Sequence, residues 1–520
     1  MPEEARWKWG LLVALVAGAF LLRVHDVSRI FLWLDETDFF NFHVWGEHPQ
    51  SLIDFARTTK ESTTNTMGWP AIIWINCRLF GATLGVARAG AVLAGTAAVG
   101  LVFLLVYRLI PVTFGAARFV PAILAAALTA MAMPQIEFSQ RTYPYGATTF
   151  AAVLLLLAHL EVFRALAGNS GSLSRPITLY TCAGVFGVFI HPSLDVLLAV
   201  SLTFLAARAW RNVRRGVGPS RRVFLKTALI AGPILGAAAL LNAKNPKAGY
   251  RVYLPEYYHR SLHSMPALAG HAYDLIAYHL NLFYDSSLYW PQRINWALLP
   301  LVLLCVSGWA LAAIGKFGPE ARQFAQLGLA VTGVLAAFST VGIFPFGGVR
   351  QTLLLSPFLY AFTGLGAWTL RTNRAARLVG ILAAIVYVAA WAFNLPHFYD
   401  ERVSVYDAGD IVQAWQQNGQ LPVYTRGSEW ELQYIMRNHP EIEIHTLAPF
   451  PQAPYLLVAT HWPPLENQTF YFGYSQSLKK EKYRADLVAA KPSLHMDSLR
   501  YRTSLYYPPN SFWVYKISAQ

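Results

Sequence analysis

The stretch "WKWGLLVALVAGAFLLRVHDVSRIFLWLDETDFF" (residues 7–40) decides how this chain folds. Its first part, residues 7–24, is apolar and long enough to cross a hydrocarbon core of roughly 30 Å. The part that follows places Asp35, Glu36 and Asp38 among Trp, Leu and Phe. Because charged groups near membrane depth are costly, acids in such a setting mark function more often than packing. The stretch therefore predicts a first membrane span followed by a functional loop.

Apolar runs of similar length recur along the chain. The 520 residues are 55% hydrophobic and 13% charged, whereas an ordinary globular protein is roughly 25% charged. We predict a polytopic α-helical membrane protein with about 11 transmembrane helices. The first run lacks an A-x-A cleavage site, so we expect it to remain as a signal-anchor. The predicted spans are residues 7–24, 86–108, 118–134, 145–164, 176–191, 193–210, 223–242, 294–315, 323–343, 351–370 and 376–395.

A twelfth apolar stretch, "GWPAIIWINCRLFGAT" (68–83), decides the topology. If it does not span and the N-terminus is cytoplasmic, the basic loops, including "RNVRRGVGPSRR" (211–222), all face the cytoplasm, as the positive-inside rule expects. If it spans, that basic loop would have to be translocated. We therefore predict that residues 68–83 lie along or dip into the outer face, with their backbone satisfied by neighbouring protein.

The last part of the chain has a different composition. Residues 396–520 hold 11 Lys and Arg against 12 Asp and Glu, so this tail carries −1 and residues 1–395 carry +15 of the net charge of +14. Orientation signals explain this distribution better than nucleic-acid binding does. The tail is predicted to form strands at "LPVYTR" (421–426), "EIEIHTL" (441–447), "PYLLVATHW" (454–462) and "SFWVYKI" (511–517), with a helix at "SEWELQYIMRNH" (428–439).

These patterns divide the chain into two domains. We expect a transmembrane domain at 1–395, with outer-face loops 25–85 and 243–292, and a C-terminal extracytoplasmic α/β domain at 396–520. The three cysteines, Cys77, Cys182 and Cys305, all lie in apolar segments. Neither a disulfide framework nor a CxxC zinc pattern can be built from them.

The acids of the first loop invite a chemical interpretation. A carboxylate beside Trp33 and Phe39 is partly desolvated, so its pKa should rise toward the value that a general base needs. Asp35, Glu36 and Asp38 also repel one another, which favours an arriving cation, an arginine partner or a reacting proton. The alternative, equally good for Asp38, is a solvated cap just above the bilayer. Two acids in one loop permit a divalent cation without requiring one.

Several motifs together resemble a known family. They are "WLDETDFF" (33–40), "GWPAIIWINCRLFG" (68–81), "VARAGAVLAG" (86–95), "MPQIEFSQRTYPYGATTF" (133–150) and "FGGVRQTLLLSPFLYAFTGLG" (346–366). This arrangement resembles the membrane glycosyltransferases of the C superfamily, most closely the protein O-mannosyltransferase and aminoarabinose-transferase type. Those enzymes use a polyprenyl-phosphate sugar donor and carry an essential acid in the first outer loop. The resemblance implies that Asp35 is the catalytic base and Glu36 its orienting neighbour, although Trp69-Pro70 stands where the family often has a proline pair.

Such a transfer also needs cations. The transition state has oxocarbenium character, and the leaving phosphate must be held. Arginine suits phosphate because its planar fork binds two oxygens. The predicted substrate- and phosphate-binding residues on the outer face are Arg141, Tyr143, His191, Arg251, His259, Arg260 and Arg350.

Several of these residues have a structural alternative. Arg350, after a Gly-Gly turn, could snorkel to lipid phosphates, and Arg141 could pair with Glu137. His191 could line a pocket or pair with Asp195 to stabilise its turn. Arg251, His259 and Arg260 lie in a loop that is basic and aromatic throughout.

The sequence therefore predicts a glycosyltransferase in the cytoplasmic (inner) membrane, multi-pass, with its C-terminal domain outside. It would transfer a sugar from a polyprenyl-phosphate-linked donor to a lipid, glycan or protein acceptor on the extracytoplasmic face, with inversion. Its partners would be donor, acceptor and lipid bilayer, with no nucleic acid. The alternatives are a transporter or flippase of a lipid-linked sugar, which usually shows paired broken helices, and a catalytically inactive scaffold.

Overall fold

The computed structural model divides the chain into two compact units, Met1–Val27 with Glu47–Asn394, and Ser28–Gly46 with Leu395–Gln520. We describe each unit by itself. The residues that the structure describes are 3–30, 36, 51, 68–167, 173–215, 232–236, 265–282, 296–340, 344, 346–347, 350–371, 374–400, 408–425, 432–433, 436, 438–446, 453–460, 483–491 and 512–519.

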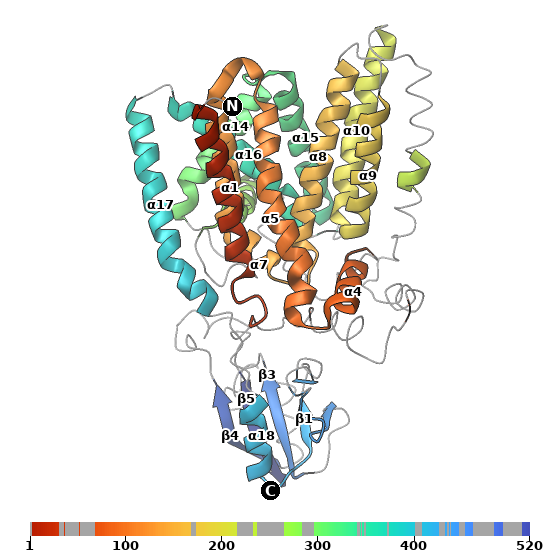
Figure 1. The fold of residues 1–520 in the computed structure, drawn as a ribbon, viewed down its shortest axis with the longest axis vertical. Coiled ribbons are helices and arrows are strands. Elements are labelled where there is room, and N and C mark those ends of the chain that lie inside the picture. The colour runs from red at the N-terminus through yellow and green to blue at the C-terminus, as the bar shows by residue number, and fades with distance from the viewer. Residues whose placement is uncertain are drawn as a thin grey trace. The chain divides into compact units, whose positions relative to one another are not determined.

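The first unit is helical (Figure 1). Its described helices are α1 (Glu3–Val24), α4 (Gly68–Phe80), α5 (Leu84–Leu109), η2 (Val112–Arg118), α6 (Phe119–Met131), α7 (Met133–Ser139), α8 (Tyr145–Ala167), α9 (Ser174–Ile190), α10 (Ser193–Arg214), α13 (Met265–His279), η5 (Trp296–Leu298), α14 (Leu299–Ala313), α15 (Gly318–Thr340), η6 (Arg350–Leu355), α16 (Ser356–Gly366), η7 (Ala367–Arg371) and α17 (Arg374–Asp400).

Most of the predicted spans form such helices. In the described part of the chain, eight stretches are long and apolar enough to cross a membrane, and two further apolar helices, Ser174–Ile190 and Leu299–Ala313, are shorter. Together they match ten predicted spans, and the remaining one, 223–242, lies almost entirely outside the described residues. The predicted fold class, a polytopic α-helical membrane protein with a C-terminal α/β sheet region, is confirmed.

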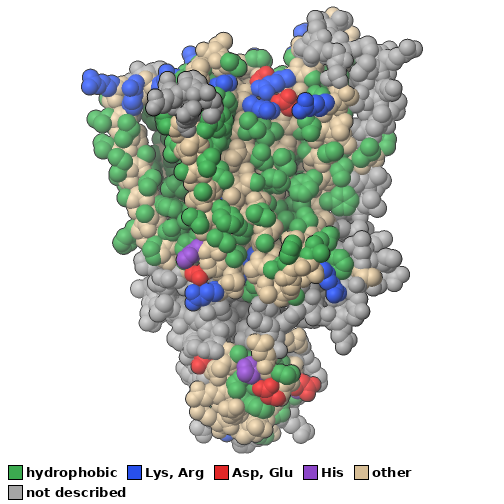
Figure 2. Space-filling model, viewed as in Figure 1, with side chains coloured by type: hydrophobic (Ala, Val, Ile, Leu, Met, Phe, Trp, Pro, Cys, Tyr) green, Lys and Arg blue, Asp and Glu red, His purple; other side chains and the backbone are tan. Residues whose placement is uncertain are grey.

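Charged side chains join helices at one end of this unit. Arg164 donates to both carboxylate oxygens of Glu320, at 2.9 and 2.7 Å, and to the backbone oxygen of Arg108 at 2.7 Å. Arg108 in turn donates to Glu161 at 2.6 Å. The ends of α5 and α8 therefore meet the start of α15, as the predicted alternation of loops requires. Figure 2 shows Lys and Arg side chains gathered at this end of the unit, beyond a broad hydrophobic surface.

The opposite end holds the exit of α1. Arg23 is fully buried and donates to the backbone oxygens of Ala19, Thr129 and Ala130 at 3.0, 2.9 and 3.2 Å. Arg88, in the second turn of α5, donates to the backbone oxygen of Val27 at 2.8 Å. The chain therefore leaves α1 and enters α5 at the same end of the unit.

The helix between them, α4, is the stretch whose topology was in question. Its 13 residues extend about 20 Å at 1.5 Å per residue, which is short of a roughly 30 Å hydrocarbon core. With both flanking helices meeting at one end, α4 does not cross the unit. The prediction that residues 68–83 do not span agrees with this geometry.

The helices α14 and α16 pack closely because a glycine of each faces the backbone of the other. A Cβ at Gly308 of α14 would collide with the backbone oxygen of Phe362, and one at Gly366 of α16 with that of Leu304. Small residues that let backbones approach are how membrane helices commonly associate. This contact fixes α16 and therefore the short helix η6 that precedes it.

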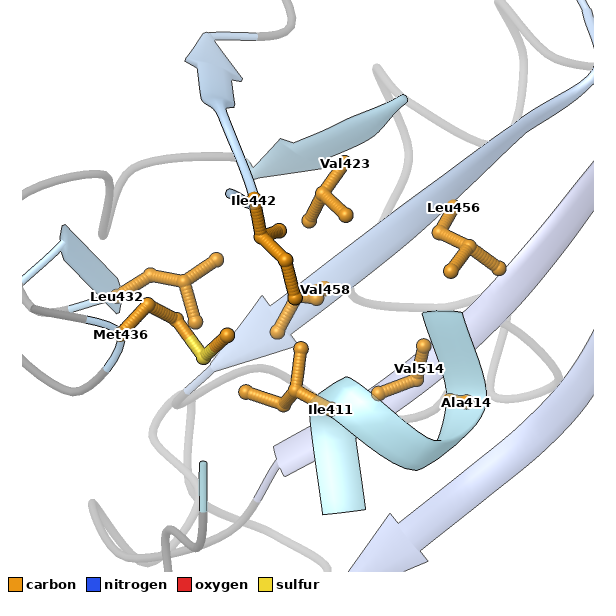
Figure 3. Close-up of a cluster of buried hydrophobic side chains, with 9 residues drawn as sticks. All are labelled: Ile411, Ala414, Val423, Leu432, Met436, Ile442, Leu456, Val458 and Val514. Atoms are coloured by element: carbon orange, nitrogen blue, oxygen red, sulfur yellow. The ribbon is translucent and has the colours of Figure 1, made fainter. Parts of the chain in front are cut away.

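The second unit contains a five-stranded mixed sheet in the order β2-β1-β3-β5-β4. Its strands are β1 (Val423–Thr425), β2 (Ile444–Thr446), β3 (Tyr455–Thr460), β4 (Tyr483–Lys491) and β5 (Phe512–Ala519), and its helix is α18 (Ala408–Gln417). Ile411 and Ala414 of α18 pack on Val458 and Val514 in a buried apolar cluster (Figure 3). The four predicted strands are present, whereas α18 and β4 were not predicted. The predicted helix 428–439 lies largely outside the described residues.

Candidate functional site

The candidate site of the first unit is built around Arg350, the first residue of η6. Gly347, three residues before it, has a φ of 119°, a conformation that favours glycine. The turn delivers a half-buried guanidinium next to two tyrosine rings: its central carbon lies 5.5 Å from the ring centre of Tyr143 and 5.5 Å from that of Tyr145. A cation over aromatic faces is stabilised by the ring quadrupoles, so both tyrosines hold this arginine in place.

The two tyrosines come from the turn between α7 and α8. Their rings stack with centres 5.5 Å apart and planes 8° apart. The ring of Tyr145 also meets the edge of Phe138, at 5.4 Å, and joins a buried cluster with Tyr278 and Leu353. Tyr143, a predicted ligand-binding residue, therefore lies beside Arg350. Tyr145, which the prediction omitted, lies beside the same guanidinium. Aromatic residues two positions apart at the start of an apolar run were the signal for both.

His191 is the third predicted residue at this place. It lies between α9 and α10, and its ring centre is 5.2 Å from that of Tyr145. Its Nδ1 is 2.7 Å from the hydroxyl of Ser193. Burial, and then the charge of Arg350, lowers the pKa of His191 to about 3. The imidazole is therefore neutral at physiological pH, and Arg350 supplies the positive charge.

The pairing of His191 with Asp195, which the sequence left open, does not occur, because the histidine bonds Ser193 instead. Asp195 lies in the first turn of α10, and its Oδ1 is buried without a hydrogen-bond partner in the described part of the chain.

Arg141 makes the ion pair that was its structural alternative. Its Nε donates to Oε1 of Glu137 at 2.7 Å, four residues earlier, and the two side chains are 3% and 0% exposed. Breaking such a pair would leave one buried charge uncompensated, at a cost of about 3–5 kcal/mol. Arg141 thus stabilises the α7–α8 turn that carries the two tyrosines, which does not exclude its predicted contact with a ligand.

Two further side chains hold that turn, and the prediction missed both. The amide of Gln140 donates to the backbone oxygens of Leu22, Arg23 and His25 at 3.3, 3.1 and 2.8 Å. The indole of Trp69 in α4 donates to the backbone oxygen of Thr142 at 2.6 Å. The turn is therefore joined both to the end of α1 and to the non-spanning helix α4. A buried glutamine gives no periodic signal, and only the packed structure reveals its partners.

The remaining predicted residues divide in two. Glu36 is described and fully buried. Asp35, Asp38, Arg251, His259 and Arg260 lie outside the described residues. Among the residues that the structure describes, no three His, Cys, Asp or Glu side chains come together to hold a metal ion.

Comparison with solved structures relates the fold of this chain to known proteins. No family model and no curated protein matches the sequence. Among solved structures, an oligosaccharyltransferase of Archaeoglobus fulgidus, crystallised with zinc and sulfate, aligns with a TM-score of 0.50 and 11% identity over 93% of this chain and 72% of the other.

Two further structures also align. They are the A. fulgidus oligosaccharyltransferase AglB with an inhibitory peptide and dolichol-phosphate (TM-score 0.48, 12% identity, 93% and 70% covered) and ArnT of Cupriavidus metallidurans with undecaprenyl phosphate (TM-score 0.43, 12% identity, 97% and 98% covered). The fold assignment rests on the first structure. At this identity the likeness shows a shared fold.

Proposed function

We propose that this multi-pass membrane protein is a glycosyltransferase that moves a sugar from a polyprenyl-phosphate carrier to an acceptor on the extracytoplasmic face, with inversion at the anomeric carbon. The observation that carries the proposal is the guanidinium of Arg350, held over the rings of Tyr143 and Tyr145 in a chain with this fold. The solved neighbours are complexes with zinc and sulfate, with an inhibitory peptide and dolichol-phosphate, or with undecaprenyl phosphate.

Arg350 would act on the carrier phosphate. As the bond between the anomeric carbon and the phosphate oxygen breaks, negative charge builds on the leaving phosphate, and an arginine fork can donate to two of its oxygens. The tyrosine rings fix the fork before substrate arrives, so little reorganisation is needed during reaction. His191, neutral beside it, offers a ring edge to the same ligand without adding charge.

Asp35 would act on the acceptor. An acceptor hydroxyl or amine must lose its proton as it attacks the anomeric carbon, and a desolvated carboxylate can take that proton. Glu36, buried next to it in sequence, would orient the base. Direct attack on the face opposite the phosphate inverts the anomeric configuration. In the long outer loop, Arg251, His259 and Arg260 remain proposed ligands for the phosphate or the sugar.

The proposal is tested by mass spectrometry of glycolipids and glycans from cells with and without the protein. We expect a defined glycoconjugate to lose one sugar when the protein is absent, while the polyprenyl-phosphate sugar accumulates. Unchanged glycoconjugates would contradict the proposal. If purified protein in vesicles moves the intact lipid-linked sugar across the bilayer without releasing the sugar, the protein is a flippase instead.

We propose that the protein lies in the inner membrane with residues 396–520 on the outer side. This orientation rests on the basic loop 211–222 and the near-neutral tail. In a variant whose native cysteines are replaced, we expect a cysteine at Gly216 to be protected from a membrane-impermeant thiol reagent in intact cells and one at Glu429 to be labelled. A membrane-permeant reagent is the control for reactivity at both positions. Labelling at residue 216 in intact cells would contradict this orientation.

A further inference from the structure

Behind Arg350, a chain of buried polar side chains runs through the first unit. Gln135 of α7 donates to the hydroxyl of Ser356 at 3.0 Å. That hydroxyl lies 2.9 Å from Nδ1 of His279, whose Nε2 lies 3.2 Å from the hydroxyl of Thr352. The hydroxyl of Thr352 donates to the backbone oxygen of Gly347 at 3.1 Å. Four helices and the turn before Arg350 are thereby connected.

The direction of each bond follows from the number of hydrogens present. The carbonyl of Gly347 can only accept, so the single hydroxyl hydrogen of Thr352 is used there. Nε2 of His279 must then donate to Thr352, which leaves Nδ1 of the neutral ring as an acceptor. Ser356 accepts from Gln135 and therefore has its own hydrogen available for Nδ1. One tautomer of His279 satisfies the whole chain, and its assignment comes from this network.

The surroundings keep that tautomer in place. His279, Thr352 and Ser356 are 0% exposed and Gln135 is 1% exposed. Burial lowers the pKa of His279 to about 3, so the ring stays neutral. The hydroxyl of Tyr360 donates to the backbone oxygen of His279 at 2.9 Å and fixes the end of α13. A buried donor or acceptor without a partner costs about 1–3 kcal/mol of folding free energy, so breaking one of these hydrogen bonds is unfavourable for the whole chain of bonds.

From this geometry we propose that the polar relay Gln135–Ser356–His279–Thr352 is the positioning device that holds the Gly347 turn and thereby presents Arg350 to its ligand. The relay rests on the proposed function only for the identity of that ligand. His279 and Thr352 touch no substrate in this proposal. They act through the turn, because Thr352 bonds the very residue whose left-handed backbone starts the approach to Arg350.

The first test measures the turn itself. In purified protein, we expect Thr352→Val to speed amide hydrogen exchange in the segment 344–355 by about tenfold, the effect of losing roughly 1 kcal/mol of local stability. Thr352→Ser, which keeps the hydroxyl, should restore slow exchange. Thr129→Val is the matched control, because Thr129 is equally buried and its hydroxyl donates within its own helix, to the backbone oxygen of Ala125 at 2.8 Å. Unchanged exchange in Thr352→Val would overturn the relay whatever the protein does.

The second test uses two amide replacements of His279. Glutamine can place an N–H donor near Nε2 and keep the bond to Thr352, whereas asparagine can accept near Nδ1 but cannot reach Thr352. In a turnover assay with a polyprenyl-phosphate sugar and an acceptor, we expect the activity of His279→Gln to stay within a few-fold of wild type and His279→Asn to lose turnover by roughly 100-fold, the effect of a misplaced group. Undecaprenyl phosphate is the separate probe of donor binding. The loss should appear in kcat more than in KM. Equal behaviour of the two variants would overturn the relay.

The two tests separate this proposal from the proposed function. Faster exchange in Thr352→Val with no binding of undecaprenyl phosphate by the wild type would keep the relay and reject the function. Binding that Arg350→Ala weakens, with exchange unchanged in Thr352→Val, would keep the function and reject the relay.

Discussion

Replacing Asp35 by asparagine is expected to lower sugar transfer at least about 100-fold, because the substitution keeps the shape of the side chain and removes the proton acceptor. Donor binding and expression should stay near wild type, since an amide is similar in size and the carrier phosphate is held elsewhere. The measurement is turnover of purified protein with a polyprenyl-phosphate sugar and an acceptor, together with a binding titration of undecaprenyl phosphate.

Asp38→Asn is the matched control, since it makes the same chemical change three residues further along the same loop. We expect it to keep most of its activity if Asp38 is a solvated cap. A fully active Asp35→Asn variant would remove Asp35 from the role of base, and Glu36→Gln would become the informative substitution. Equal losses in Asp35→Asn and Asp38→Asn would indicate a general effect on the loop rather than a base.

The second large effect is expected at Arg350. Lysine keeps the charge but loses the two-pronged geometry, so Arg350→Lys should lower kcat by about 100-fold while donor affinity changes less. Arg350→Ala should lower both, because the charge is also lost. The same assay measures both variants, with inorganic phosphate and undecaprenyl phosphate as binding probes to separate the lipid contribution from that of the phosphate.

Arg118 offers a matched control for this substitution. Its guanidinium carbon lies 3.8 Å from the ring centre of Tyr107, so it too is an arginine over a tyrosine ring, but it is the last residue of η2, between α5 and α6. Arg118→Lys should leave turnover unchanged. An Arg350→Lys variant as active as wild type would support the snorkelling alternative, in which any cation at headgroup depth is sufficient.

The spans could be predicted because hydropathy over about 20 residues is a local property. The breaks within these spans could not be predicted in the same way. The predicted span 118–134 breaks at Ala132, where ψ turns to 124° and α6 gives way to α7. Only Pro134, at the start of α7, hinted at this break. In the second unit, β4 was missed because its nine residues, "YRADLVAAK", combine charges with alanine and lack the aromatic and β-branched pattern of the other strands.

The charged and aromatic residues of the site could be predicted from the sequence, whereas the buried residues that hold them in position could not. Arg350 and Tyr143 stood out because a glycine turn and an aromatic turn deliver them to the ends of apolar runs. His279 of α13 lies 73 positions before Thr352 of η6 and 77 before Ser356 of α16, and no sequence period connects it to them. Their role exists only once α13 packs against α16. The sequence allows Arg141 to bind a ligand or to pair with Glu137, and the structure shows the buried ion pair with Glu137.

The helix α17 has a consequence of a different kind. None of its best apolar window, within Arg377–Pro396, is buried, and its ties to the rest of the helical unit include Tyr387 to the backbone oxygen of Ala297 and Trp391 to that of Met131. An exposed apolar face on a membrane-spanning helix is suited to lipid chains, which require only that a side chain be apolar. Among related proteins we expect this helix to exchange Leu, Ile, Val and Phe freely and to keep only its length and hydropathy, whereas α8, which is 72% buried over its window, changes slowly.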